Sequence, residues 1–300
     1  MTIAQTEANG ISITYEDKGP EDAPVILLVM GLGGQLTLWP DEFVDALNAH
    51  GFRTIRYDNR DVGLSTRFEA AGVPNLKWMF VKAALGLPVR PAYTLADMAA
   101  DGIALLDHLG IARAHIVGAS MGGMIAQHIA ARYPDRVLSL TSVMSTTGNR
   151  RLPRADKDAM RVLANRPMSG DKEALIAYSV NAARVIGSPG YPAAEERLQR
   201  RVRSDFERGW YPQGVARQMA AIAADGDRRA MLRQIMVPTL VIHGEDDPLV
   251  PIAGGRDTAA TIPGARLMTV PGMGHDLPLA LVDTLADAIS DHAKGVALAA

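Results

Sequence analysis

Short apolar runs rich in β-branched residues alternate along the chain with segments of helical periodicity. The predicted strands are residues 11–15, 25–30, 53–58, 114–119, 137–144, 238–244 and 266–270. Between them lie helical patterns, such as the apolar stripe that follows Thr94 and ends near Gly110. Strands that alternate with helices are typical of an α/β fold with a mostly parallel central sheet and flanking helices.

Residues 147–230 interrupt this alternation, because they contain helical patterns and no convincing strand. We expect them to form a helical cap inserted into a core made of residues 1–146 and 231–300. The insertion carries 16 Lys and Arg against 10 Asp and Glu, a net charge of +6, whereas the remainder, with 15 against 23, carries −8. Solvated amphipathic helices and electrostatic steering of anionic substrates both explain this asymmetry.

Composition narrows the possible chemistry. The 300 residues include no cysteine, which excludes thiol nucleophiles, zinc-thiolate sites and iron–sulfur clusters. A net charge of −2 provides no excess of positive charge to bind a phosphate backbone, so we expect no nucleic-acid partner. No metal-binding pattern such as H-E-x-x-H occurs, and we expect no cofactor and no metal.

The first ten residues resemble no targeting leader and the longest apolar run is too short to cross a bilayer, so we expect a cytoplasmic protein without a stable membrane anchor. The oligomeric state stays open.

The strongest local signal is the G-x-S-x-G pattern at residues 118–122, between an apolar strand and a helical segment. A serine at such a turn has a strained backbone that lifts its hydroxyl above the sheet, and the flanking glycines leave room for close packing. The same pattern also occurs in ordinary glycine-rich turns. Its strand–turn–helix setting favours Ser120 as a nucleophile.

A serine nucleophile needs a base and an acid that orients the base. Among seven histidines, His275 lies just after the last predicted strand, where open α/β sheets place their sites. Asp247 lies in the acidic loop that follows the strand at residues 238–244, although an ordinary surface turn would have the same sequence pattern. The chain order Ser120, Asp247, His275 is the order expected when successive strand ends supply these groups.

The chain resembles the α/β-hydrolases over essentially its whole length, and among them the serine carboxylesterase-like and methylesterase-like members. GASMGGM matches the family's nucleophile turn, HGEDDPLVP its acidic loop and PGMGH its histidine loop. The resemblance implies Ser120 as nucleophile, His275 as general base and Asp247 as the orienting acid. It also implies that the helical insertion covers the catalytic face.

Two positions depart from the family pattern. Met30 stands where these hydrolases generally carry a histidine before the oxyanion loop, which puts in doubt the side-chain support of that loop. By analogy, the backbone N–H groups of Leu32 and Met121 form the oxyanion hole. The segment YDNRDVGLST carries Asp61 where glycine is usual, and we interpret it as a mainly structural loop.

The substrate pocket is the least determined part of the sequence. Trp39, Trp78, Phe80 and Tyr178 are candidates to line it, although large side chains at helical spacing are more often part of a core. The segment that contains Trp78 is equally consistent with an amphipathic piece at an interface.

The sequence leaves three functional hypotheses. The first is hydrolysis of methyl or short acyl esters of a small molecule through an acyl-enzyme intermediate. The second is C–C bond hydrolysis, lactone hydrolysis or cofactor-free perhydrolysis by the same three residues. The third is a ligand-binding receptor on a hydrolase scaffold. Haloalkane dehalogenases and epoxide hydrolases are disfavoured, because those relatives carry aspartate at the position of Ser120.

Overall fold

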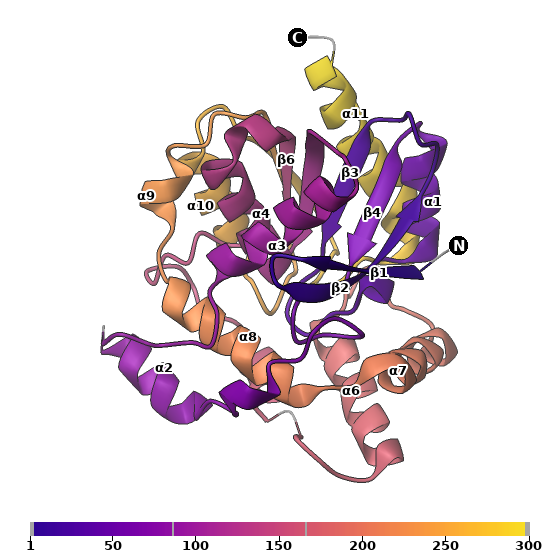
Figure 1. Ribbon diagram of the computed structural model, residues 1–300. Coiled ribbons are helices and arrows are strands. Elements are labelled where there is room, and N and C mark those ends of the chain that lie inside the picture. Colours follow the sequence, from indigo (N-terminus) through magenta and orange to yellow (C-terminus); the bar gives the residue numbers. More distant parts are fainter. Residues whose placement is uncertain (1–2, 86, 166, 298–300) are drawn as a thin grey trace.

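The computed structural model describes residues 3–85, 87–165 and 167–297, without the side chains of residues 80, 83, 84, 296 and 297. One sheet has the strand order β1-β2-β4-β3-β5-β6-β7-β8 (Figure 1). It is parallel from β4 to β8, whereas β1 and β2 form an antiparallel edge. The strands are β1 (Ile3–Ala8), β2 (Ile11–Lys18), β3 (Val25–Val29), β4 (Arg53–Tyr57), β5 (Ala114–Ala119), β6 (Val137–Val143), β7 (Thr239–Gly244) and β8 (Arg266–Val270). The predicted α/β fold with a mostly parallel sheet is confirmed.

Strand β1 was absent from the sequence prediction, which began the sheet at residue 11. It forms a hairpin with β2 through Asn9 and Gly10, whose φ angles are 51° and 74°. A two-residue turn with positive φ at both positions matches the right-handed twist of the strands, and Asn-Gly is its preferred sequence. The signal was present in the sequence but lies before the first strongly apolar run.

Eleven α-helices are present in the described residues. They are α1 (Asp41–Ala49), α2 (Leu76–Ala84), α3 (Leu95–His108), α4 (Met121–Arg132), α5 (Lys157–Ala164), α6 (Lys172–Ile186), α7 (Glu195–Gly209), α8 (Pro212–Asp225), α9 (Arg229–Leu232), α10 (Ala253–Thr261) and α11 (Val282–Ala297). Short 3₁₀ turns occur at Leu36–Leu38, Glu69–Ala71, Pro134–Arg136 and Leu279–Leu281. Thr94 caps α3 as its sequence predicts, in a reciprocal capping box with Asp97.

Helices cover both faces of the sheet. One apolar cluster packs α3 and α4 against one face, and a second packs α1 and α11 against the other. Helices α6, α7 and α8 lie together with α2 beyond one end of the sheet, where the arrowheads of the parallel strands point (Figure 1). Helices α6 and α7 share a small apolar cluster of their own. The carboxyl ends of the parallel strands therefore face the helical segment between β6 and β7.

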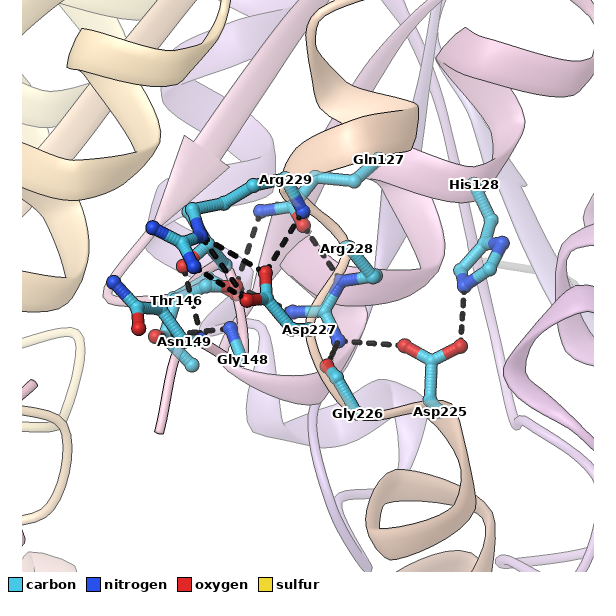
Figure 2. A network of polar contacts seen from close by, with 12 residues as sticks. Gln127, His128, Thr146, Gly148, Asn149, Asp225, Gly226, Asp227, Arg228 and Arg229 are labelled. Carbon is cyan, nitrogen blue, oxygen red and sulfur yellow. Dashed lines mark hydrogen bonds and ion pairs between the residues drawn. The ribbon is translucent and has the colours of Figure 1, made fainter. Parts of the chain in front are cut away.

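A buried arginine joins the two ends of that helical segment (Figure 2). Arg228 donates from Nη1 to Asp225 Oδ2 at 2.6 Å, from Nη2 to the carbonyl of Thr146 and from Nε to Gln127 Oε1 at 3.0 Å. Asp225 also contacts His128 Nε2 at 2.7 Å. Since Gln127 and His128 belong to α4, the chain leaving β6 and the chain after α8 are tied to each other and to α4.

The two connecting segments also touch through their backbones. Gly148 has a φ of 78°, and a Cβ placed on it would lie 1.9 Å from the carbonyl oxygen of Gly226. Any larger residue at position 148 would force the two segments apart. The segment between β6 and β7 therefore begins and ends at one point on the core.

His115 is a buried histidine in the middle of the sheet. Its side chain lies on β5, 4% exposed, and Nδ1 contacts Ser139 Oγ at 2.8 Å. Burial, with smaller contributions from His292 and Arg113, lowers the pKa of His115 to about 4. A group that stays neutral in the folded chain but takes a proton in the unfolded chain makes stability depend on pH.

We therefore expect stability to fall as the pH drops from about 6.5 towards 4. Below pH 6.5 the unfolded chain binds a proton on His115 that the folded chain binds only near pH 4. The free energy of unfolding should lose about 2 kcal/mol from this residue between pH 7 and pH 5. Urea unfolding at stepped pH measures it, and His115→Gln should flatten the slope. A variant of the exposed His108, on α3, controls for loss of a histidine, and equal slopes in His115→Gln and the unaltered protein would contradict the assignment.

Candidate active site

Ser120 lies in the turn that joins β5 to α4, and its backbone is strained. Its φ and ψ are 57° and −120°, a region that residues with a Cβ rarely occupy. Its N–H donates to Val143 O at 2.9 Å, and its carbonyl accepts from Ser145 Oγ at 2.8 Å. These contacts with β6 and the loop after it hold the strained turn in place.

Glycines on either side of Ser120 let three backbones approach closely. A Cβ on Gly118 would lie 2.1 Å from Gly122 O, and one on Gly122 would lie 1.9 Å from Val29 O. Both distances are far below any possible contact between a carbon and an oxygen. Strands β3 and β5 and the start of α4 can therefore meet at the turn only if both positions are glycine.

His275 connects Ser120 to Asp247. Its Nε2 is 2.9 Å from Ser120 Oγ, and its Nδ1 is 2.7 Å from Asp247 Oδ2. Because an ionised carboxylate only accepts hydrogen bonds, this pairing assigns the proton to Nδ1 and leaves Nε2 to accept from the serine hydroxyl. Both His275 and Asp247 are buried. The arrangement brings together the three residues that the sequence analysis selected.

The carboxylate of Asp247 is itself held by its loop. Oδ1 accepts from the backbone N–H groups of Leu249 and Val250 at 2.9 and 2.8 Å, which leaves Oδ2 directed at His275. The neighbouring acids point elsewhere, since Glu245 and Asp246 are exposed. Asp247 is the member of the acidic triplet that reaches the histidine.

His243 supports the same loop, a role that sequence reasoning missed because the residue lies inside a predicted strand. It is fully buried on β7, and its Nε2 donates to Val250 O at 2.7 Å. Burial lowers the pKa of His243, so the ring stays neutral with its proton on Nε2. A Cβ on Gly255 would lie 2.5 Å from Nδ1, so α10 packs directly against this ring.

The loop after β3 lies against the nucleophile turn. A Cβ on Gly31 would be 2.9 Å from Ser120 Cβ and 3.5 Å from the backbone nitrogen of Met121. Met121 begins α4, and the first N–H groups of a helix have no acceptor within the helix. Leu32 follows Gly31 and is partly buried against the main core. Both backbone groups expected to bind an oxyanion therefore belong to segments that border Ser120.

The three candidate pocket residues whose side chains the structure describes are not brought together. Trp39 is fully buried in the core and stacks on Phe43 with ring centroids 5.4 Å apart, so the expectation that it lines a pocket is not supported. Trp78 lies on α2 and is 57% exposed. The hydroxyl of Tyr178 donates to Val162 O within the helical segment. The side chain of Phe80 lies outside the described residues.

A small cavity lies instead between the loop after β3 and helices α6 to α8. Its volume is about 110 Å³, and its apolar lining includes Leu38, Val202, Phe206, Trp210 and Val215. The ring of Phe206 on α7 stacks on that of Trp210, the residue after α7, with centroids 5.2 Å apart. The sequence signal was the pair of aromatic residues four positions apart in the insertion, which the sequence analysis did not use.

A buried ion pair joins the loop after β4 to α8. Asp61 is fully buried with a φ of 67°, and it accepts from Arg217 Nε and Nη2, both at 2.8 Å. Tyr93 also donates its hydroxyl to Asp61 at 2.7 Å. The aspartate that departs from the family's usual glycine thus has a specific partner in the helical segment.

The described residues were also compared with the geometry of metal sites and of membrane-spanning helices. In the ranges that the structure describes, no group of three or more His, Asp or Glu side chains is arranged to hold a metal ion. Within the same ranges, no helix has the length and apolar character needed to cross a membrane.

Comparisons with known proteins agree with this geometry. A family model described as alpha/beta hydrolase fold matches residues 24–279. Rhodomycin D methylesterase of Streptomyces sp. (strain C5) is 31% identical over 297 residues, covering 92% of each chain. The solved enol-lactonase of Burkholderia xenovorans LB400 has a TM-score of 0.73 at 25% identity, covering 97% of this chain and 100% of that one. A meta-cleavage product hydrolase of Pseudomonas fluorescens IP01, with a TM-score of 0.75 and 98% of both chains covered, is 21% identical and shows the shared fold alone.

The Asp61–Arg217 pair gives a stability prediction. Arg217→Met removes the positive charge and leaves a buried carboxylate unpaired, which should lower the free energy of unfolding by about 3 to 5 kcal/mol. The double variant Asp61→Asn/Arg217→Met removes both charges, and asparagine tolerates the positive φ. It should therefore recover much of the loss. Urea unfolding measures all three proteins, and a double variant no more stable than Arg217→Met would contradict the explanation.

Proposed function

We propose that this chain, which belongs to the alpha/beta hydrolase fold family, is a serine hydrolase that cleaves carboxylic esters, with methyl and short acyl esters as its substrate class. The observation that carries the proposal is the hydrogen-bonded series from Ser120 Oγ through His275 to Asp247, at 2.9 and 2.7 Å. The similarity to a methylesterase over 92% of the chain supports the choice of substrate class.

In the first half of the reaction Ser120 attacks the ester carbonyl. His275 Nε2 accepts the hydroxyl proton as the bond from Oγ to the carbonyl carbon forms, and the carbonyl electron pair moves to oxygen. Asp247 stabilises the resulting imidazolium without itself taking the proton. The N–H groups of Leu32 and Met121 donate to the oxyanion, a role supported by the contact of Gly31 with Ser120.

In the second half the intermediate collapses and water completes the turnover. The imidazolium of His275 gives its proton to the alkoxy oxygen, so the C–O bond breaks and the alcohol leaves an acyl group on Ser120. Water then attacks the acyl carbon while His275 takes its proton, and the acid is released with Ser120 restored. The reaction needs no group beyond these residues and water.

We assign the helical segment at residues 147–230 as a cap on a core of residues 1–146 and 231–300. The cavity of about 110 Å³ between Gly33 and α7 borders the loop that contains Leu32, and we assign it to one small end of the ester. A cavity of this volume has room for a methoxy or short acyl group. Phe206 and Trp210 form its aromatic wall.

Lactone hydrolysis is the second candidate. A lactone is a cyclic ester, and the same attack, collapse and hydrolysis open its ring without loss of a separate alcohol. The observation that favours it is the similarity to an enol-lactonase at 25% identity over 97% of the chain. Relative kcat/KM on open and cyclic esters separates the two candidates.

Replacement of Ser120 tests the proposal. Ser120→Ala should lower kcat by about 10⁴-fold or more on methyl esters and p-nitrophenyl acyl esters, because the nucleophile is lost while the fold remains. A panel that adds lactones, a dienoic ring-cleavage product and peroxide as acyl acceptor ranks the alternative activities. Turnover beyond one equivalent of product separates an enzyme from a ligand-binding protein.

The chain contains a matched control in the buried pair His115–Ser139, which has the same two side chains at 2.8 Å inside the sheet. Ser139→Ala should retain turnover and labelling by a fluorophosphonate, whereas Ser120→Ala should lose both. Retained turnover in folded Ser120→Ala, or no turnover of any ester by the unaltered protein, would refute the proposed function.

A further inference from the structure

A glutamine from the helical segment holds the loop that contains Leu32. The backbone N–H of Gly33 donates to Gln218 Oε1 at 2.8 Å, across 185 positions of sequence. Gln218 lies on α8 and is fully buried. The same side chain donates from Nε2 to the carbonyl of Arg60 at 2.9 Å. One amide thus bridges the loop after β3 and the loop after β4.

The bridge requires an amide. A backbone N–H can only donate and a backbone carbonyl can only accept, so the side chain between Gly33 and Arg60 must offer one acceptor and one donor. These partners also fix which end of the Gln218 amide is oxygen. An ionised glutamate would offer acceptors alone, and methionine would fill the space with no comparable donor.

Gln218 is mounted on a rigid support. Arg60, whose carbonyl it binds, pairs with Asp101 through Nε and Nη2, both at 2.6 Å. Arg217, the residue before Gln218 on α8, forms the buried ion pair with Asp61 described above. Buried ion pairs therefore fix both Arg60 and the turn of α8 that carries Gln218.

The loop after β3 has its external contact with Gln218 directly beside Leu32. Gly33 has a φ of 64° and is followed by Gly34, so the backbone just after Leu32 has more conformational freedom than any other residue type would allow. Its other hydrogen bonds are one inside the turn and two at its ends: the Gly34 N–H donates to Gly31 O at 3.1 Å, Met30 O accepts from Asn59 Nδ2, and Gln35 Oε1 accepts from Arg208. The bond to Gln218 is made by the residue adjacent to Leu32.

We propose that Gln218 is a positioning residue for the oxyanion loop. By holding the Gly33 N–H it fixes the peptide after Leu32, and so aims the Leu32 N–H at the place where the ester oxygen gains charge. The inference rests on the proposed function, because it assigns Leu32 a part in that reaction. It makes the cap a component of the catalytic apparatus, since the cap supplies the support of an oxyanion donor.

Gln218→Met tests the proposal by removing both hydrogen bonds while keeping a similar side-chain length. We expect kcat to fall by about 10 to 100-fold with KM within about twofold, because an oxyanion donor acts on the transition state and not on the bound ester. The affinity of Gln218→Met for a boronate that mimics the tetrahedral intermediate should fall by the same factor as its kcat/KM. Gln218→Glu keeps an acceptor for Gly33 and should retain more of kcat than Gln218→Met.

Asn48→Leu is the matched control. The amide of Asn48 on α1 donates to the carbonyls of Lys18 and Phe52 at 3.0 and 2.9 Å, near the start of β4 and away from the site. Its removal should lower stability as Gln218→Met does but leave kcat unchanged. Equal falls of kcat in the two variants would overturn the positioning role.

Amide hydrogen exchange at Gly33 supplies a readout that does not depend on activity. Exchange should be faster in Gln218→Met than in the unaltered protein. Unchanged exchange at Gly33, or a folded Gln218→Met variant whose kcat is within twofold of normal, overturns the inference. The proposed function still stands in that case if the protein hydrolyses esters and this activity depends on Ser120. An unaltered protein that hydrolyses no ester overturns the proposed function and this inference with it.

Discussion

The close packing of β3, β5 and α4 around Ser120 is the constraint on which the site depends. Gly118 and Gly122 admit no Cβ, and Gly31 lies against Ser120 itself. Within this packing Ser120 has a φ of 57°, and its hydroxyl lies 2.9 Å from His275 Nε2. The other groups of the site then need only extend from neighbouring strand ends, as Asp247 does after β7 and His275 after β8.

Most of this arrangement could be predicted from the sequence because its causes are local. The glycines around Ser120 are required by the geometry of one turn, and the pattern of apolar strands fixes which loops meet at the same edge of the sheet. Asp247 and His275 could be selected because each follows a predicted strand in the expected chain order. The hairpin at Asn9 and Gly10 was also readable, but it was overlooked.

What escaped prediction depends on contacts between distant parts of the chain. An aromatic residue such as Trp39 can fill a core or line a cavity, and its packing against Phe43 and the other buried residues of its cluster decides between them. Nothing near Gln218 indicates that it reaches Gly33, because helical periodicity shows which face is buried but not what covers it. The two departures from the family pattern, at Met30 and Asp61, both lie in segments that contact α8. The loop after Met30 and the carboxylate of Asp61 find partners in two successive residues of α8.

The meeting of Gly148 with Gly226 beneath Arg228 has an evolutionary consequence. The entropic cost of closing a loop rises only with the logarithm of its length, so residues can be gained or lost beyond this junction at little expense to the sheet. Different helical segments can thus be transplanted onto the same core. A transplanted segment would nevertheless have to supply its own replacement for Gln218. Only segments that can support the loop after β3 are therefore compatible with this core.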